Sequence, residues 1–192
     1  KPSVKGLGLI VNATQATVES DSFDNTYDEN APTKISTVSF SSGTHEITEN
    51  IQASGRYGAV QAEGTAQFTI NADVYAVYSN GGAMAVEAGG TSKVVINGGD
   101  FRQVGVPDDD KVCDLIYGTD SATIEINGGT FKAVDPTRTL NCIDGSKAQI
   151  IVKGGSFYQY DPSKHTLGDG EVVVAAGYKV VQNGDWFNVV PE

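Results

Sequence analysis

The sequence predicts an all-β protein, a right-handed parallel β-helix (β-solenoid) closed at its C-terminal end by a β-hairpin. The first observation is a repeat: residues 96–101, 126–131 and 152–157 nearly superimpose, and each carries Gly-Gly followed two residues later by Phe. Residues 70–75 form a degraded fourth copy, so the copies begin 26, 30 and 26 residues apart (70 to 96, 96 to 126, 126 to 152). The second observation is a strand-like alternation of apolar and polar residues, and the third is the near absence of helical periodicity.

Apolar residues recur at fixed distances from the start of each copy. They form four columns, placed ten and two residues before the start and five and eight residues after it. In that order the columns are Val60, Val86, Ile116 and Cys142; Phe68, Val94, Ile124 and Ile150; Tyr75, Phe101, Phe131 and Phe157; and Tyr78, Val104, Val134 and Tyr160. Polar neighbours separate them, which predicts short strands with one face inward. Because one turn of such strands cannot bury its apolar face alone, we expect the turns to stack with like residues aligned.

The chain is expected to form one domain with three segments. Residues 1–34 are predicted to be an extended N-terminal anchoring segment, residues 35–176 the rungs of the solenoid, and residues 177–192 a capping hairpin that turns at Asn183-Gly184. The aromatic residues of the hairpin, Trp186 and Phe187, are expected to cover the last rung.

The repeat also contains glycine corners and insertions. Each Gly-Gly pair fits a corner that needs a positive φ or a close approach of two backbones. Insertions at residues 105–111, 135–139 and 161–169 all follow the Phe column. We therefore expect variable loops on one side of the solenoid, and that side is often where solenoids bind their ligands.

Charge and composition narrow the function classes. The 192 residues include 13 basic and 24 acidic side chains, a net charge of −11, which argues against nucleic acid as a partner. No run approaches the roughly 20 apolar residues that span a bilayer. Cys113 and Cys142 are expected to be two buried thiols, with a single disulfide as the alternative. The chain begins at Lys1, which leaves open whether a leader precedes it.

Few residues carry the chemistry of a catalytic site. His45 and His165 have no ligand partners at metal spacing and are expected to be surface residues. Asp135 and Asp161 are each followed by Pro and are expected to start turns.

An acidic column remains the alternative for these aspartates. Together with the run Asp108-Asp109-Asp110, such a column would serve a hydrolase or hold Ca²⁺. The arginines Arg56, Arg102 and Arg138 are scattered and do not form the cluster that a polyuronate lyase needs. We assign no catalytic, cofactor-binding or metal-binding residue from the sequence.

From residue 65 to its C-terminus the chain resembles the right-handed parallel β-helices of the pectin-lyase-like class, on its Gly-Gly-x-Phe rungs and column pattern. Residues 150–191 are similar to the repeat ends of bacteriophage fibre and capsid-decoration proteins and of gut-bacterial surface proteins. Three runs carry this likeness: Gly154-Gly155-Ser156-Phe157, Asp161-Pro162-Ser163 and Gly177-Tyr178-Lys179-Val180-Val181. Enzymes of the class carry catalytic Asp, Lys and Arg on the helix face, and no position of this sequence matches them.

The resemblance implies a non-enzymatic structural protein of a phage virion surface: a head fibre, a capsid decoration or a tail-fibre component. Such a protein would have protein partners, form a homo-oligomer and span no membrane. The alternative is a secreted or surface-anchored bacterial protein that binds a glycan through its loop side. A third hypothesis is a small polysaccharide lyase or hydrolase, for which Asp108, Asp110 and Asp135 would be the residues to mutate.

Overall fold

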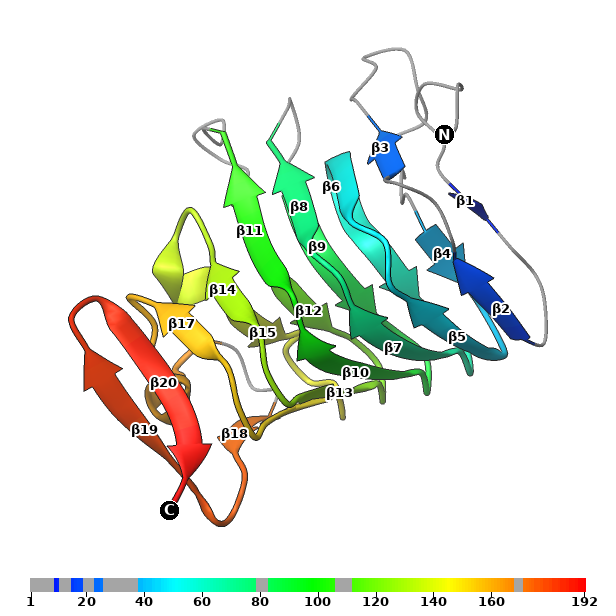
Figure 1. Ribbon diagram of the computed structural model, residues 1–192. Helices are drawn as coiled ribbons and strands as arrows, with labels where there is room; N and C mark the ends of the chain where they lie inside the picture. Colours follow the sequence, from blue (N-terminus) through cyan, green and yellow to red (C-terminus); the bar gives the residue numbers. More distant parts are fainter. Residues whose placement is uncertain are drawn as a thin grey trace.

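The computed structural model describes residues 9–10, 15–18, 23–25, 38–78, 83–105, 112–167 and 171–192, with the backbone alone at 9–10, 15–18, 23–25, 53–57 and 83. Over these residues the chain forms a parallel β-solenoid of about five turns, as the repeat predicts (Figure 1). Each complete turn passes through three sheets, which we call B, C and A in the order in which the chain meets them.

The strands of each sheet come from successive turns. Sheet B holds β2 (Gln15–Val18), β5 (Thr44–Ile47), β7 (Gln67–Asn71), β10 (Lys93–Gly98), β13 (Thr123–Ile126), β16 (Gln149–Val152) and β18 (Glu171–Val174). Sheet C holds β3 (Phe23–Asn25), the first part of β6 (Ile51–Ala62), β8 (Val74–Val77), β11 (Asp100–Val104), β14 (Thr130–Lys132), β17 (Ser156–Tyr158), β20 (Trp186–Pro191) and β19 (Tyr178–Asn183). Sheet A holds β1 (Leu9–Ile10), β4 (Val38–Phe40), the last part of β6, β9 (Ala83–Ala88), β12 (Ile116–Gly118) and β15 (Leu140–Cys142). Because β6 runs through both C and A, these two sheets are joined into one sheet of 13 strands.

Parallel pairing in register holds successive turns together. In sheet B, Ile124 of β13 pairs with Val94 on one side and with Ile150 on the other, and all three are buried. Phe68 pairs with Val94 in the same way, so this predicted column is confirmed. Alternation along each strand sends one residue into the core and the next outward, as in the pattern of β13.

The centre of the core is a stack of three phenylalanines. The Phe101 and Phe131 rings lie 5.1 Å apart at 12°, and the Phe131 and Phe157 rings lie 4.8 Å apart at 10°. All three side chains are fully buried. Their spacing follows from the distance between neighbouring strands, about 4.8 Å, which brings identical rings into contact when the turns are in register.

The two glycines of each corner have different roles. The second glycine is in the left-handed region, with φ of 112° at Gly99 and 104° at Gly129. The first glycine of the middle copy, Gly128, lies against the previous turn, where a Cβ would be 2.5 Å from the carbonyl oxygen of Asn97. The corner therefore needs its second glycine for its conformation. The close approach of two turns requires the first glycine at Gly128 but not at Gly98, where a Cβ would meet nothing within 4 Å. Beside it, Asn127 Nδ2 donates to Asn97 Oδ1 at 3.0 Å.

Tyr75 does not belong to the Phe column, contrary to the sequence prediction. Val74 pairs with Phe101, and Tyr75 pairs with Arg102 on the outward face. The degraded copy has one residue fewer at its corner, because Asn71 pairs with Gly98 after a register shift that follows Ile96. Fixed spacing in the sequence was therefore off by one in this turn.

The column eight residues after the start of each copy is also wrong. Tyr78 and Tyr160 are buried, but Val104 is 43% and Val134 is 40% exposed. Each valine lies three positions after an inward Phe, so alternation turns it outward. Tyr160 has the same spacing from Phe157, but the positive φ of 51° at Gln159 interrupts the alternation there.

The column of Val60, Val86 and Ile116 is correct for these three residues and wrong at its end. Leu140 pairs with Ile116 in this column, whereas Cys142 pairs with Gly118 two positions further on.

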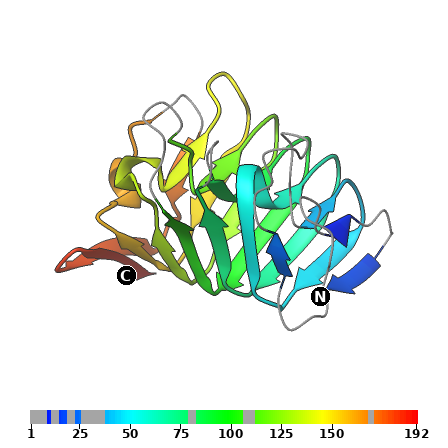
Figure 2. The ribbon, with the colours of Figure 1, turned by 90° about the horizontal axis from the view of Figure 1, so that it is seen from above.

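The two ends of the solenoid differ (Figure 2). At the N-terminal end β1, β2 and β3 pair in parallel with β4, β5 and β6, so the strands described among residues 1–34 belong to a further turn. Most of residues 1–34 lie outside the described residues, so the anchoring role of this segment stays a prediction. At the C-terminal end β19 and β20 form the expected hairpin, and β20 pairs antiparallel with β17.

Details of the hairpin depart from the prediction. Asn183 pairs with Trp186, so the turn is Gly184-Asp185, one residue later than expected, with φ of 60° at Gly184. Phe187 pairs with the buried Phe157 and so lies on the inward face with the buried Val189, as predicted. Trp186 instead pairs with Tyr158 on the outward face of sheet C and does not cover the last rung. The hairpin caps the solenoid by extending sheet C.

The corner at Gly98-Gly99 offers a matched test of the fold. We expect Gly99→Ala to lower the free energy of unfolding by about 1–3 kcal/mol or more, because φ is positive there and a Cβ would overlap the carbonyl oxygen of Ala72. Gly98→Ala is the control, since a Cβ at Gly98 meets nothing within 4 Å, and should change stability by less than about 1 kcal/mol. Denaturant unfolding measures both, and equal midpoints for the two variants would contradict this account of the corner.

Candidate functional site

The two Asp-Pro sequences start turns, as expected. Asp135 caps the 3-10 helix η1 (Pro136–Arg138), and its Oδ1 accepts from Thr137 N at 3.0 Å. Asp161 caps η2 (Pro162–Lys164) in the same way. Burial alone would raise the pKa of Asp161, but hydrogen bonds from Ser163 and Lys164 outweigh it and lower this pKa. Both carboxylates thus accept hydrogen bonds from the backbone N–H groups of the turns that they start.

The acidic run at 108–110 lies outside the described residues, so its part in an acidic column stays a prediction. Within the described residues no three or more His, Cys, Asp or Glu side chains gather in a way that could hold a metal ion. Of the three arginines, Arg102 lies on sheet C and pairs with Asp100, whereas Arg138 ends η1 and pairs with Asp114. The side chain of Arg56 is not described.

The prediction of surface histidines was wrong. His45 is 1% exposed and occupies the inward column of sheet B, where it pairs with Phe68 and stacks on Phe40 at 3.7 Å. Its Nε2 lies 2.6 Å from the carbonyl oxygen of Ser42. His165 is partly buried, and its Nδ1 lies 2.9 Å from the Tyr160 hydroxyl. Burial lowers the pKa of His165. Both histidines therefore serve packing.

Cys113 and Cys142 are not joined by a disulfide. Cys142 is buried as expected, whereas Cys113 is only partly buried.

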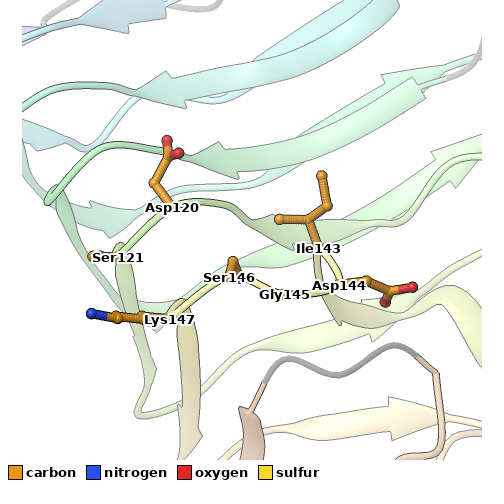
Figure 3. A pocket seen from close by; sticks show the side chains of 7 residues that line it. All are labelled: Asp120, Ser121, Ile143, Asp144, Gly145, Ser146 and Lys147. Atoms are coloured by element: carbon orange, nitrogen blue, oxygen red, sulfur yellow. The ribbon is translucent and has the colours of Figure 1, made fainter.

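A shallow hollow lies at the corner that follows β15. It encloses about 440 Å³ and is lined by Asp120, Ser121, Ile143, Asp144, Gly145, Ser146 and Lys147. Figure 3 shows that Asp120, Asp144 and Lys147 point in different directions. The Asp120 carboxylate accepts from Gly90 N at 2.8 Å and so holds the preceding turn. Because its polar groups do not converge, this hollow is a weak candidate for a ligand site.

The outward face of sheet C carries a more ordered group of side chains. Five residues from five successive strands form one column, which we call the ladder: Tyr75, Arg102, Lys132, Tyr158 and Trp186. The strands that carry it, β8, β11, β14, β17 and β20, follow one another from right to left in Figure 1. Arg102, Lys132 and Tyr158 each come directly after a phenylalanine of the core stack, so alternation points them outward.

Neighbouring side chains of the ladder hold one another in place. The guanidinium of Arg102 lies 5.1 Å from the centre of the Tyr75 ring, and Lys132 Nζ lies 4.4 Å from the centre of the Tyr158 ring. Tyr158 and Trp186 meet edge to face at 5.3 Å. Each contact of this kind contributes of the order of 0.5–1 kcal/mol at an exposed site. The ladder is therefore a preorganised surface of rings and cations.

The charge of this face changes along the solenoid. At the N-terminal half Arg102 pairs with Asp100, and the Tyr75 hydroxyl donates to the same carboxylate at 3.3 Å. At the C-terminal half the column next to the ladder carries the uncharged Thr130, Ser156 and Asn188, in register with one another. Lys132 thus has uncharged side chains beside it on β14 and β17, whereas Asp100, one strand earlier in the same column, accepts from Thr130 Oγ1 at 2.9 Å.

Exposed valines border the ladder. Val104 and Val134, two of the four large hydrophobic residues that are most exposed in the described part, follow Arg102 and Lys132 on the same face. Aromatic rings, cations and aliphatic side chains on one rigid sheet can bind a partner without a large ordering cost. The sequence prediction missed the ladder, although the residue after each Phe column position was the available signal.

Comparisons of the chain with protein-family models, with curated proteins and with solved structures found no match. The resemblance to pectin-lyase-like helices and phage fibres therefore stays a prediction beyond the solenoid fold itself. In the described part of the chain no helix is long and apolar enough to cross a membrane.

The buried thiol gives a chemical test of the core. Burial, reinforced by the charges of Asp114 and Glu171, raises the pKa of the Cys142 thiol to about 12. At pH 8 roughly one molecule in ten thousand would carry the thiolate, against about a quarter for an ordinary thiol. We expect a Cys113→Ser variant to resist alkylation by iodoacetamide while folded and to react readily in denaturant. Equal labelling rates in the two states would contradict the burial of Cys142.

Proposed function

We propose that this chain is a non-enzymatic structural protein that assembles with further copies of itself through the outward face of sheet C. The ladder is the observation that carries the proposal. Tryptophan, tyrosine and arginine are the residue types that dominate the binding energy of protein interfaces, and here they lie in one column on a flat sheet. The cations beside the rings cover part of the ring faces, which favours a protein partner over stacked sugars.

Charge supports a neighbouring copy as the partner. The exposed amino group of Lys132 suits an acidic surface, and a chain of net charge −11 offers acidic surface elsewhere. The exposed Val134 adds apolar area that such a contact would bury. Because the contacting face and the acidic surface differ, the contact joins two different surfaces of the two copies, a heterologous contact.

The setting that we propose for this assembly is the surface of a phage virion. A solenoid built of stacked turns is a stiff element that can project from a larger particle. A bacterial cell surface is the alternative setting, and an upstream secretion or lipoprotein signal in the full gene would favour it.

Solution mass tests the proposal. We expect the whole chain to form a defined oligomer in light scattering, with less oligomer as ionic strength rises. Trp186→Ala together with Lys132→Glu should raise the dissociation constant at least tenfold, because truncating an aromatic residue that anchors an interface costs about 2 kcal/mol or more. Lys132→Glu is also tested alone, because Lys132 is exposed and lies on β14, outside the hairpin, so this change should not affect folding.

Lys93→Glu is the matched control, because Lys93 is also exposed on a strand but lies on sheet B. A monomer at all concentrations, or an equal shift with the control, would overturn the proposal. A variant without residues 1–33 distinguishes a contact through sheet C from a contact through the predicted N-terminal anchor. An oligomer that falls apart on truncation but tolerates Lys132→Glu would place the contact at the N-terminus instead.

A further inference from the structure

The far edge of the C-terminal hairpin is open in the described part of the chain. β19 ends sheet C, with β20 on one side and no described strand on the other. The hairpin lies at the outer end of the solenoid in both ribbon views (Figures 1 and 2). With six residues, β19 is the longest described strand that ends a sheet, since β2 and β18 have four residues and β1, β3 and β15 have fewer.

The pairing within the hairpin shows which backbone groups face this edge. Asn183 directly precedes the two-residue turn and so exchanges backbone hydrogen bonds with its partner on β20, and such pairs recur at every second residue of β19. The bond from Glu192 N to Gly177 O, 2.9 Å long, fits this alternation. Val180 and Gln182 lie between the bonded positions, so the N–H and C=O groups of both residues point away from β20. Two donors and two acceptors therefore lie along the open edge.

The side chains of β19 leave this edge accessible. Lys179, Val181 and Asn183 point to the outward face of sheet C, because Asn183 pairs with Trp186 there. Val181 is 45% exposed, the highest value among the four large hydrophobic residues that are most exposed in the described part. β19 pairs with β20 without a bulge and contains no proline, so it lacks two common devices that keep strand edges from pairing. A regular edge strand of this kind favours pairing with another strand.

The edge of β19 is complementary to itself. In an antiparallel pair centred on Val181, Val180 of one copy opposes Gln182 of the other, and each such pair exchanges two hydrogen bonds. All four edge-facing groups of Val180 and Gln182 are then bonded in each copy. The two Val181 residues oppose each other in a non-hydrogen-bonded pair, where side chains are closest, so each valine covers the other.

The charges of the hairpin agree with this register. Lys179 of one copy would oppose the uncharged Asn183 of the other, with Asp185 of that copy at the diagonal position, which a long side chain can reach. Lys179 and Asp185 are both exposed. Because the axis is two-fold, this attraction occurs twice. An axis through Lys179 would instead set two lysines against each other, which is unfavourable.

We propose that β19 pairs with β19 of a second copy of this chain, antiparallel about a two-fold axis at Val181, so that two sheets C are joined edge to edge. The contact is isologous, because both copies use the same strand. It uses no residue of the ladder and does not rest on the proposed function. Since a single pair of strands buries little area, the contact is weak on its own and adds to any other contact between copies.

A cysteine trap tests the pairing in the full chain. Val181→Cys is combined with Cys113→Ser, which leaves the buried Cys142 as the other thiol, and with Lys132→Glu, which removes the ladder contact. Opposed residues of a non-hydrogen-bonded pair have Cα atoms roughly 4.5 Å apart, within reach of a disulfide. With glutathione disulfide as the oxidant, we expect covalent dimers on non-reducing electrophoresis.

Val104→Cys in the same background is the matched control, because Val104 is 43% exposed on sheet C but lies on β11, away from the edge. We expect Val181→Cys to form dimers at least about ten times faster than this control. Equal rates for the two variants would overturn the proposal. If Val181→Cys gives no dimer while Lys132→Glu still dissolves an oligomer of the unaltered chain, the ladder assembly stands and the edge pairing is wrong.

A proline at the edge tests the hydrogen bonds. Gln182→Pro, added to the trap variant, removes an N–H that faces the edge, and an edge strand tolerates proline at such a position. We expect cross-linking to slow about tenfold or more, because each dimer loses two of its four hydrogen bonds. Gln182→Ala keeps the N–H and is the matched control, which should cross-link at the rate of the trap variant. Equal rates for proline and alanine would contradict the pairing.

A charge pair at the axis guards against a folding defect caused by the proline. Val181→Lys and Val181→Glu, each made with Lys132→Glu, set like charges opposite each other in a dimer and should each associate more weakly than the parent chain. An equal mixture of the two should form mixed dimers in native mass spectrometry. A mixture that forms mixed dimers no more readily than its two components form their own would overturn the register centred on Val181.

Discussion

Parallel pairing of each strand with the equivalent strand of the next turn is the constraint on which the rest of the structure depends. It brings Phe131 between Phe101 and Phe157 and buries all three rings. It also brings the backbones of neighbouring corners so close that Gly128 cannot carry a side chain against the Asn97 carbonyl oxygen. Core and corner are thus consequences of one register, because a turn shifted by one residue would lose both.

The same register orders the surface. Whatever residue follows a buried position lies beside its counterparts on the neighbouring turns, so outward side chains form columns as regular as those of the core. Lys132 meets the Tyr158 ring, and Asn127 bonds to Asn97, for this reason alone. A solenoid can therefore change its binding chemistry one column at a time without altering its core.

The repeat was sufficient to predict the solenoid, because Gly-Gly-x-Phe fixes both the corner and the inward column in three turns. It failed where a turn departs from the common length. Tyr75 was placed one position off, since its corner is one residue short, and this error concealed the ladder. His45 was missed because a polar residue in an apolar column looks like a loop residue until its ring is seen stacked on Phe40. The contact between Asp114 and Arg138 could not be predicted, because the two residues lie on neighbouring turns and no fixed spacing in the repeat relates them.

The three sheets end at different heights. Among the described strands sheet A stops at β15, sheet B continues to β18, and sheet C continues through β20 to β19. The C-terminal end is therefore a staircase, with the hairpin as its highest step, and it offers no flat set of strand edges on which the first turn of another copy could be laid. This stepped end therefore disfavours end-to-end stacking of flat strand edges and favours contacts through the faces of the sheets or through the single edge of the hairpin.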